Sequence, residues 1–258
     1  MLNTINQTPW FQLSKANDPS IRLFCFPFAG GGASAYRHWE KAMPDHVQTC
    51  RVQLPGRENR IKAFPIREMN TLLNALAIEI QPLLDRPFAF FGHSMGAIVA
   101  YELARKLTDK GYQPDILFVS GCRPPHIVDT QPIHHLSTPE FVDALKSRGG
   151  IHEELLNSAE YMAMVEPTLR ADLELIESWH RDFDTPLSCP LHVFAALDDK
   201  VSPIEVTHEW AKYSTLPLIS HSLKGGHFFV QDPTQNVTGR VASALKPYER
   251  NKNKKHII

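Results

Sequence analysis

Short runs of apolar, β-branched or aromatic residues alternate with amphipathic stretches along most of this chain. Runs of this kind predict β-strands, and apolar residues recurring every third or fourth position predict helices. The predicted strands are residues 22–28, 47–54, 88–91, 116–121, 191–197 and 219–223. The predicted helices are residues 36–43, 69–84, 97–109, 204–213 and 234–245.

This alternation predicts an α/β fold, in which βαβ units build a mostly parallel sheet with helices on both faces. Such sheets carry their active sites just outside the carboxyl ends of the strands. We therefore expect catalytic residues immediately after predicted strands.

One stretch, at about residues 123–186, interrupts the alternation because it contains no convincing strand. Ser137 or Thr138 is expected to cap a helix with Pro139 in its first turn, and a longer helix pattern covers residues 169–179. Helices inserted between two strands favour a lid over the strand ends, although plain helical packing is the alternative. No repeat or linker divides the chain, so residues 1–258 are expected to form one domain.

Composition and charge exclude several classes of protein. The chain has 258 residues, 43% of them apolar, and a formal net charge of −1 from 27 basic and 28 acidic residues. This balance argues against nucleic-acid and membrane-surface binding, and no apolar run is long enough to span a bilayer. The first residues, 1–7, lack the features of a signal peptide, so a cytoplasmic location is expected. The four cysteines have no zinc-site spacing and are expected to be buried, reduced thiols.

The most informative motif is Gly92-His93-Ser94-Met95-Gly96, which lies between a predicted strand and a predicted helix. This is the G-x-S-x-G pattern of a nucleophile elbow, a turn so tight that small residues must flank the serine. We expect Ser94 to be the nucleophile and the N–H of Met95, at the start of the helix, to stabilise an oxyanion. His93 should point into the structure and support the site.

A serine nucleophile needs a histidine base and an acid that orients the histidine, and in this fold the chain order is serine, acid, histidine. His227 follows the last predicted strand and two glycines, which makes it the candidate base. Asp198 and Asp199 follow the preceding strand, and one of them is the candidate acid. We favour Asp199, because Asp198 is expected to finish the strand or cap the turn.

A glycine-rich loop after the first predicted strand has two interpretations. As part of a hydrolase it supplies the second oxyanion donor, the N–H of Ala29. Alternatively, Gly30, Gly32 and Ala35 fit a dinucleotide-binding fingerprint. That fingerprint requires an acidic residue ending the next strand, where this chain has Gln53-Leu54-Pro55-Gly56-Arg57 instead, so we disfavour it.

Two further polar groups are ambiguous. The pair His134-His135 lacks a carboxylate partner at ligand spacing, so a surface loop is expected rather than a metal site. The run Arg57, Glu58 and Arg60 follows a strand near the expected active face, where it could contact substrate or a partner, or form a solvated turn.

Taken together, the motifs resemble those of the type II thioesterases, free-standing α/β-hydrolases that accompany non-ribosomal peptide and polyketide synthases. The matching segments are Phe26-Pro27-Phe28-Ala29-Gly30-Gly31, Gln53-Leu54-Pro55-Gly56-Arg57-Glu58, Phe91-Gly92-His93-Ser94-Met95-Gly96-Ala97, Asp198-Asp199 and Gly225-Gly226-His227-Phe228.

The resemblance implies an α/β-hydrolase fold with a mobile helical lid over an acyl pocket. It implies Ser94 as nucleophile, His227 as base, Asp199 as acid, and Ala29 and Met95 as oxyanion donors. Residues 195–197 and 200 depart from the family pattern, so the choice between the two aspartates stays open at this point.

The function implied by the resemblance is hydrolysis of acyl groups from the phosphopantetheine arm of acyl or peptidyl carrier proteins, for proofreading or release. No cofactor or metal is expected, and neither is nucleic acid or membrane binding. The chain opens at Met1 without a carrier-protein motif before the hydrolase, so a free-standing enzyme is expected. The expected partners are carrier-protein domains, and the enzyme itself is expected to be a monomer. The alternative is a generic serine esterase or acyltransferase acting on small acyl esters or acyl-CoA.

Overall fold

The computed structural model describes residues 8–128, 131–149, 156–183 and 185–249. The segment 1–7, the tail 250–258 and parts of the expected lid lie outside the described residues. The described strands form one seven-stranded sheet in the order β1-β3-β2-β4-β5-β6-β7. Only β1 runs antiparallel, against β3, and the other pairs are parallel. The strands are β1 Phe11–Leu13, β2 Ile21–Phe26, β3 Val47–Val52, β4 Phe88–His93, β5 Ile116–Ser120, β6 Leu191–Ala196 and β7 Ile219–Leu223.

All six predicted strands are present, which confirms the mostly parallel α/β sheet. The sequence missed β1 because its three residues are too few to display an alternating pattern. β4 continues two residues beyond the predicted end, to His93, so the sheet runs directly into the serine turn. This extension places the motif at the carboxyl edge of a central strand.

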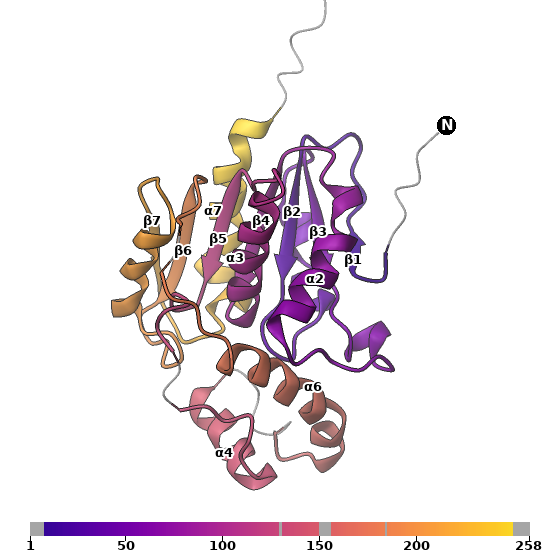
Figure 1. Ribbon diagram of the computed structural model, residues 1–258, viewed down its shortest axis with the longest axis vertical. Coiled ribbons are helices and arrows are strands. Elements are labelled where there is room, and N and C mark those ends of the chain that lie inside the picture. Colours follow the sequence, from indigo (N-terminus) through magenta and orange to yellow (C-terminus); the bar gives the residue numbers. More distant parts are fainter. Residues whose placement is uncertain (1–7, 129–130, 150–155, 184, 250–258) are drawn as a thin grey trace, which may run out of the picture.

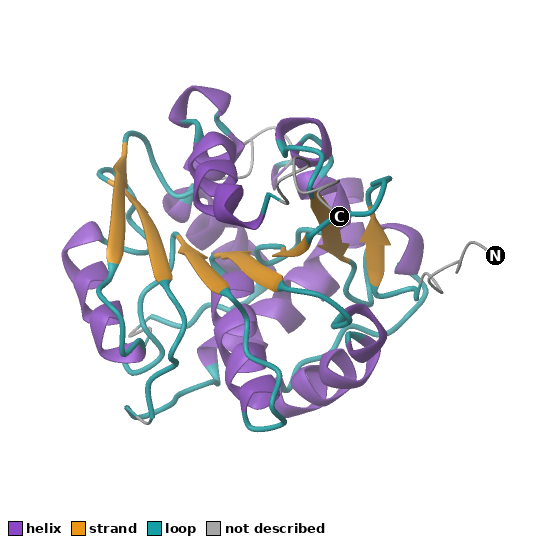
Figure 2. Cartoon of the chain, turned by 90° about the horizontal axis from the view of Figure 1, so that it is seen from above, coloured by secondary structure: helices purple, strands orange, loops and turns teal. Residues whose placement is uncertain are grey.

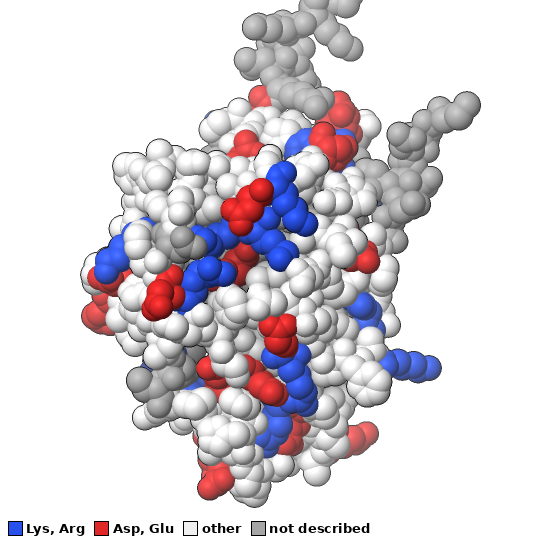
Figure 3. Space-filling view, viewed as in Figure 1, with Lys and Arg blue, Asp and Glu red and all other residues white. Residues whose placement is uncertain are grey.

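Helices cover both faces of the sheet (Figure 2). Helices α2 (Met69–Glu79) and α3 (Met95–Thr108) pack on one face, and α1 (Trp39–Ala42) and α7 (Val237–Leu245) pack on the other. Each face has its own apolar core of buried strand and helix side chains. Within the described ranges, no helix has both the length and the apolar character needed to cross a bilayer. On the face drawn in Figure 3, acidic and basic side chains lie interspersed.

Several predicted helices are shorter or tighter in the structure. α2 ends at Glu79 because Pro82 has no N–H to continue the helix, and a 3-10 turn, Gln81–Leu83, follows. The predicted helix 36–43 is a 3-10 turn, Ala33–Tyr36, followed by the short α1. Residues Ile204–Tyr213 form a 3-10 helix rather than an α-helix. α7 begins only at Val237 because Asn236 is left-handed, with φ 50°.

The connection between β5 and β6 carries two helices, α4 (Thr138–Arg148) and α6 (Ala159–Glu177), and no strand in its described part. Ser137, one of the two predicted caps, is the N-cap of α4 and forms a capping box with Glu140. α6 extends further toward the N-terminus than predicted, because Pro167 interrupts its hydrogen bonding without ending it. Both helices lie together at one end of the sheet (Figure 1) and share a small apolar core of their own.

Candidate active site

Ser94 is the single residue between β4 and α3, and its backbone is strained, with φ 54° and ψ −122°. The turn leaves no space for side chains on its glycines. A Cβ atom on Gly92 would lie 2.1 Å from the carbonyl oxygen of Gly96, and one on Gly96 would lie 2.2 Å from that of Phe26. Backbone atoms create both clashes, so the small residues of the motif are a steric requirement.

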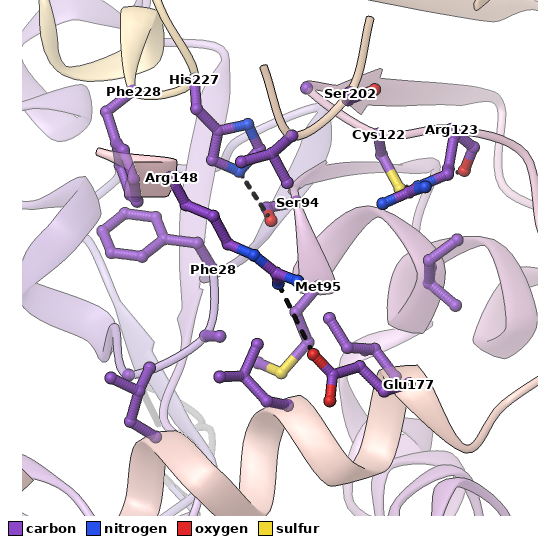
Figure 4. Close-up of a pocket in the computed structure, with 18 of the residues that line it drawn as sticks. Phe28, Ser94, Met95, Cys122, Arg123, Arg148, Glu177, Ser202, His227 and Phe228 are labelled. Atoms are coloured by element: carbon purple, nitrogen blue, oxygen red, sulfur yellow. Dashed lines mark hydrogen bonds and ion pairs between the residues drawn. The ribbon is translucent and has the colours of Figure 1, made fainter. Parts of the chain in front are cut away.

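His227 links Ser94 to Asp199 (Figure 4 shows the first of the two contacts). Its Nε2 lies 2.9 Å from the Ser94 hydroxyl, and its Nδ1 lies 2.9 Å from Oδ2 of Asp199. Ser94, Asp199 and His227 follow β4, β6 and β7, so the parallel sheet gathers them at one edge. The Asp199 side chain is fully buried whereas Asp198 is exposed, so Asp199 is the aspartate that the fold brings to the histidine.

His93 lies behind this group and is fully buried. Its Nδ1 lies 2.9 Å from the hydroxyl of Ser120, and its ring centroid lies 5.1 Å from that of His227. Burial, and next the nearby His227, hold the pKa of His93 well below its usual value. His93 is therefore neutral at physiological pH and places no second charge beside His227.

Ala29 and Met95 line the same cavity as Ser94. Met95 is the first residue of α3, so its N–H has no acceptor one turn earlier within the helix. Ala29 lies in the loop after β2, next to Gly30, whose φ of 76° is left-handed. Both expected oxyanion donors thus line the cavity that contains the serine, and they come from the ends of two neighbouring strands.

A cavity of about 310 Å³ extends from Ser94 toward the inserted helices. Much of its wall is apolar, with contributions from Phe28, Ile98, Val165, Leu169, Leu173 and Ile176. Its volume and lining suit an acyl chain, because apolar pockets of about 300 Å³ or more are typical of small-molecule sites.

One side of the cavity carries an ion pair between the inserted helices. Arg148 points across the cavity toward Glu177, with Nη1 3.5 Å from Oε1 (Figure 4). The Glu177 carboxylate is 2% exposed and also lies 2.6 Å from Nδ1 of His134. The prediction of a surface loop at His134 was therefore incomplete, because this side chain ties the loop to α6.

Arg57 lies neither in a solvated turn nor in the cavity wall, the two environments that correspond to its sequence-based interpretations. It is 5% exposed, and its guanidinium pairs with the carboxylate of Asp172 on α6. Sequence reasoning missed Asp172 and Glu177 as site residues. A signal existed. Asp172 lies three positions after Leu169 and Glu177 lies four positions after Leu173, on the apolar side of the predicted helix, where unpaired charges are rarely buried.

The glycine-rich loop does not have the features of a dinucleotide site. It leads into the four-residue 3-10 turn Ala33–Tyr36 instead of a helix whose N-terminus could hold a pyrophosphate. The N–H of Gly30 already donates to the carboxylate of Asp172 at 2.7 Å. An acid at this position would repel a phosphate.

The cysteines are free and buried, as predicted. Cys122 lines the cavity, and burial raises its pKa to about 12, so it is a protonated, unreactive thiol. In the part of the chain that the structure describes, no group of three or more histidine, cysteine or acidic side chains could hold a metal ion.

Comparison with known proteins identifies the family. Residues 21–246 match the thioesterase domain family. The gramicidin S biosynthesis protein GrsT of Aneurinibacillus migulanus is 38% identical over 86% of this chain and 88% of its own length. A second relative, named linear gramicidin dehydrogenase LgrE, of Brevibacillus parabrevis, is 36% identical over 90% of both chains.

A solved structure agrees. The type II thioesterase BorB from the borrelidin biosynthetic cluster superposes with a TM-score of 0.85 at 28% identity, covering 93% of this chain and 99% of BorB. The fold, the family match over most of the chain and the similarity to these relatives lead to one conclusion. This chain belongs to the thioesterase family and is a type II thioesterase, a thioester hydrolase of the α/β-hydrolase fold.

Proposed function

We propose that this protein is a stand-alone thioesterase that hydrolyses acyl groups from the phosphopantetheine arm of acyl or peptidyl carrier proteins. The observation that carries the proposal is the hydrogen-bonded series Ser94–His227–Asp199 at the mouth of an apolar cavity. In this proposal Ser94 is the nucleophile, His227 is the general base and Asp199 orients the histidine.

The first step is acylation of the serine. Nε2 of His227 removes the proton from Ser94 Oγ as this oxygen attacks the thioester carbonyl carbon. The carbonyl oxygen becomes an oxyanion, which the N–H groups of Ala29 and Met95 stabilise. Losing one such donor typically lowers the rate by about 10²–10³. The C–S bond then breaks, the thiol leaves with the proton from His227, and the acyl group stays on Ser94.

The second step is hydrolysis of the acyl-enzyme. His227 takes a proton from water as the water oxygen attacks the ester carbon on Ser94. A second oxyanion forms and collapses, the proton passes to Ser94 Oγ, and the carboxylic acid leaves. Asp199 stabilises the imidazolium in both steps. The cycle needs only the side chains named here and water, so we propose no cofactor.

The helices α4 and α6 are proposed to be a lid that selects the acyl chain. They supply Leu145 and Arg148, and Val165, Leu169 and Leu173, to the cavity wall. A lid built this way excludes water and contacts the chain at several points. The single domain, the monomeric state and the cytoplasmic location remain part of this proposal.

The carrier-protein substrate is supported by the relatives. GrsT is named for gramicidin S biosynthesis, and BorB belongs to the borrelidin cluster. Two other functions compete with this one. A generic esterase or acyltransferase would use the same three residues, so substrate preference must separate them. The name of LgrE suggests an oxidoreductase. In a dinucleotide-binding oxidoreductase the glycine-rich loop binds the phosphates of the cofactor, whereas here the N–H of Gly30 donates to the carboxylate of Asp172.

The test compares turnover of carrier proteins loaded with acyl chains of varied length, free acyl thioesters and nitrophenyl esters. Ser94→Ala should lower turnover of every substrate by at least about 10⁴-fold without changing the melting temperature. Ser222→Ala makes the same change at an exposed position on β7 and should be silent. Wild-type turnover by Ser94→Ala would refute the mechanism. A preference for nitrophenyl esters over loaded carriers would favour the generic esterase.

A further inference from the structure

Helix α6 and the turn after β3 are joined by a buried ion pair between Asp172 and Arg57. Nη1 of Arg57 lies 2.5 Å from Oδ2 of Asp172, and Nη2 lies 2.8 Å from Oδ1. The side chains are 5% and 2% exposed. The contact is bidentate, which fixes both groups in one plane and makes it specific for an arginine.

Every N–H of this guanidinium has an acceptor. Besides Asp172, Arg57 donates from Nε and Nη2 to the carbonyl of Pro55, both at 3.2 Å, and from Nη1 to the carbonyl of Gly31 at 3.1 Å. Oδ2 of Asp172 also accepts the N–H of Gly30 at 2.7 Å. The ion pair therefore holds the loop after β2 at two points, the carbonyl of Gly31 and the N–H of Gly30.

These bonds fix the orientation of Ala29. The carbonyl of Phe28, which shares a peptide plane with the Ala29 N–H, accepts a hydrogen bond from Gly31 at 2.9 Å. The next plane contains the Gly30 N–H, which Asp172 holds. Both peptide planes that flank Ala29 are therefore constrained, one through Gly31 and one through α6.

The same turn and helix are linked at other points. The hydroxyl of Thr168, one turn before Asp172 on α6, donates to the carbonyl of Gly56 at 2.6 Å. The Gln53 side chain accepts the N–H of Ala33 at 2.8 Å and donates to the carbonyl of Arg57 at 3.0 Å. Residues 53–57 thus form a bridge from the Ala29 loop to the inserted helix.

We propose that Arg57 and Asp172 are positioning residues that hold the Ala29 N–H in the oxyanion hole and make its geometry depend on the seating of α6. This inference rests on the proposed function. If α6 moves away from the sheet, the carboxylate of Asp172 no longer accepts the N–H of Gly30. Arg57 then also loses its counter-ion, and a buried charge without a counter-ion is unfavourable. The oxyanion hole is therefore complete only when the inserted helix covers the cavity, so the acyl group reacts in an enclosed site.

The first variant is Asp172→Asn, which keeps the shape of the side chain but removes its charge and its bidentate pairing. We expect kcat on an acyl thioester of N-acetylcysteamine to fall by about 10- to 100-fold, with KM within about threefold of wild type, because a small misplacement of a catalytic donor has this effect. Glu174→Gln is the matched control. It removes another ion pair of α6, to Arg67, outside the cavity, and should leave kcat unchanged.

A second variant separates positioning from stability. Replacing a buried ion pair by apolar residues often preserves or raises stability. The double variant Arg57→Met with Asp172→Leu should therefore keep the melting temperature while losing the bonds to Gly30 and Gly31. We expect its kcat to be as low as that of Asp172→Asn.

The readout specific to positioning is the affinity of a trifluoromethyl ketone analogue, whose adduct with Ser94 places an oxyanion in the hole. Its inhibition constant should rise in both variants by the same factor as kcat/KM falls. Wild-type kcat and analogue affinity in Asp172→Asn and the double variant would overturn the inference, as would a loss of activity with unchanged analogue affinity. Activity in Ser94→Ala would instead refute the proposed function, so the two failures are distinguishable.

Discussion

Oδ2 of Asp199 lies 2.9 Å from Nδ1 of His227, and the other carboxylate oxygen, Oδ1, is held in place by the backbone. Oδ1 accepts the N–H groups of Val201 and Ser202 at 2.8 and 2.9 Å. The carboxylate therefore cannot rotate, and it presents one oxygen to the histidine. This fixes the tautomer in which Nδ1 carries a proton and Nε2 is free to accept one from Ser94.

Asp199→Asn should therefore lower kcat by about 10⁴-fold, because the amide favours the wrong histidine tautomer and cannot stabilise the imidazolium. The affinity for substrate should change little. The measurement is steady-state hydrolysis of an acyl thioester at neutral pH. Asp198→Asn is the matched control at the exposed neighbour and should retain wild-type turnover. The reverse pattern would show that Asp198 is the orienting acid.

Gly92→Ala should prevent the serine turn from forming, because the added methyl would lie 2.1 Å from a backbone oxygen that cannot move aside. We expect a loss of more than about 3 kcal/mol in the free energy of unfolding, which places the change among the large effects of single substitutions. Urea unfolding followed by circular dichroism measures it.

Gly111→Ala is the control for this prediction. Gly111 has a positive φ, 85°, which Gly92 lacks, and a Cβ added to Gly111 would meet no atom within 4 Å. It should cost about 1–2 kcal/mol through backbone strain alone. A loss for Gly92→Ala no larger than that for Gly111→Ala would contradict the steric requirement, because the clash is the reason given for Gly92 and Gly111 has none.

His192 should make the protein less stable in mild acid. Burial, and next the neighbouring His221, lower the pKa of His192 from its ordinary 6.5 to about 4. The unfolded chain therefore binds a proton before the folded protein does. The stabilising contribution is complete above about pH 6.5, is lost as the pH falls toward 4, and changes no further below that.

His192→Gln should consequently flatten the decline of the melting temperature between pH 6.5 and 4. Buried His93, whose pKa is also lowered, should maintain part of the decline. The control His208→Gln changes a side chain that is 74% exposed and should leave the curve as in wild type. An unchanged slope in His192→Gln would contradict the assignment.

The sequence was sufficient for the positions of six of the seven described strands along the chain and for the identity of Ser94 and His227 as candidates. Period-two and apolar runs report local burial, and the chemistry of a serine nucleophile demands a later histidine. The sequence was insufficient for helix bounds, since Pro82 ended one helix earlier than periodicity predicts and Asn236 delayed the start of another. It also left open which aspartate faces the histidine, because a turn can direct either side chain inward.

By itself, then, the sequence determined the α/β class, the serine turn and the strand-end positions of the reactive groups, because these depend on local backbone preference and chain order. Only the tertiary structure decided that Asp199 reaches His227, and that Arg57 meets Asp172 across 115 positions of sequence. The physical reason is that the partners of a buried polar group are set by packing and not by distance along the sequence. The five N–H groups of a guanidinium donate to whichever carboxylate and carbonyl oxygens the packing of α6 against the sheet brings within reach.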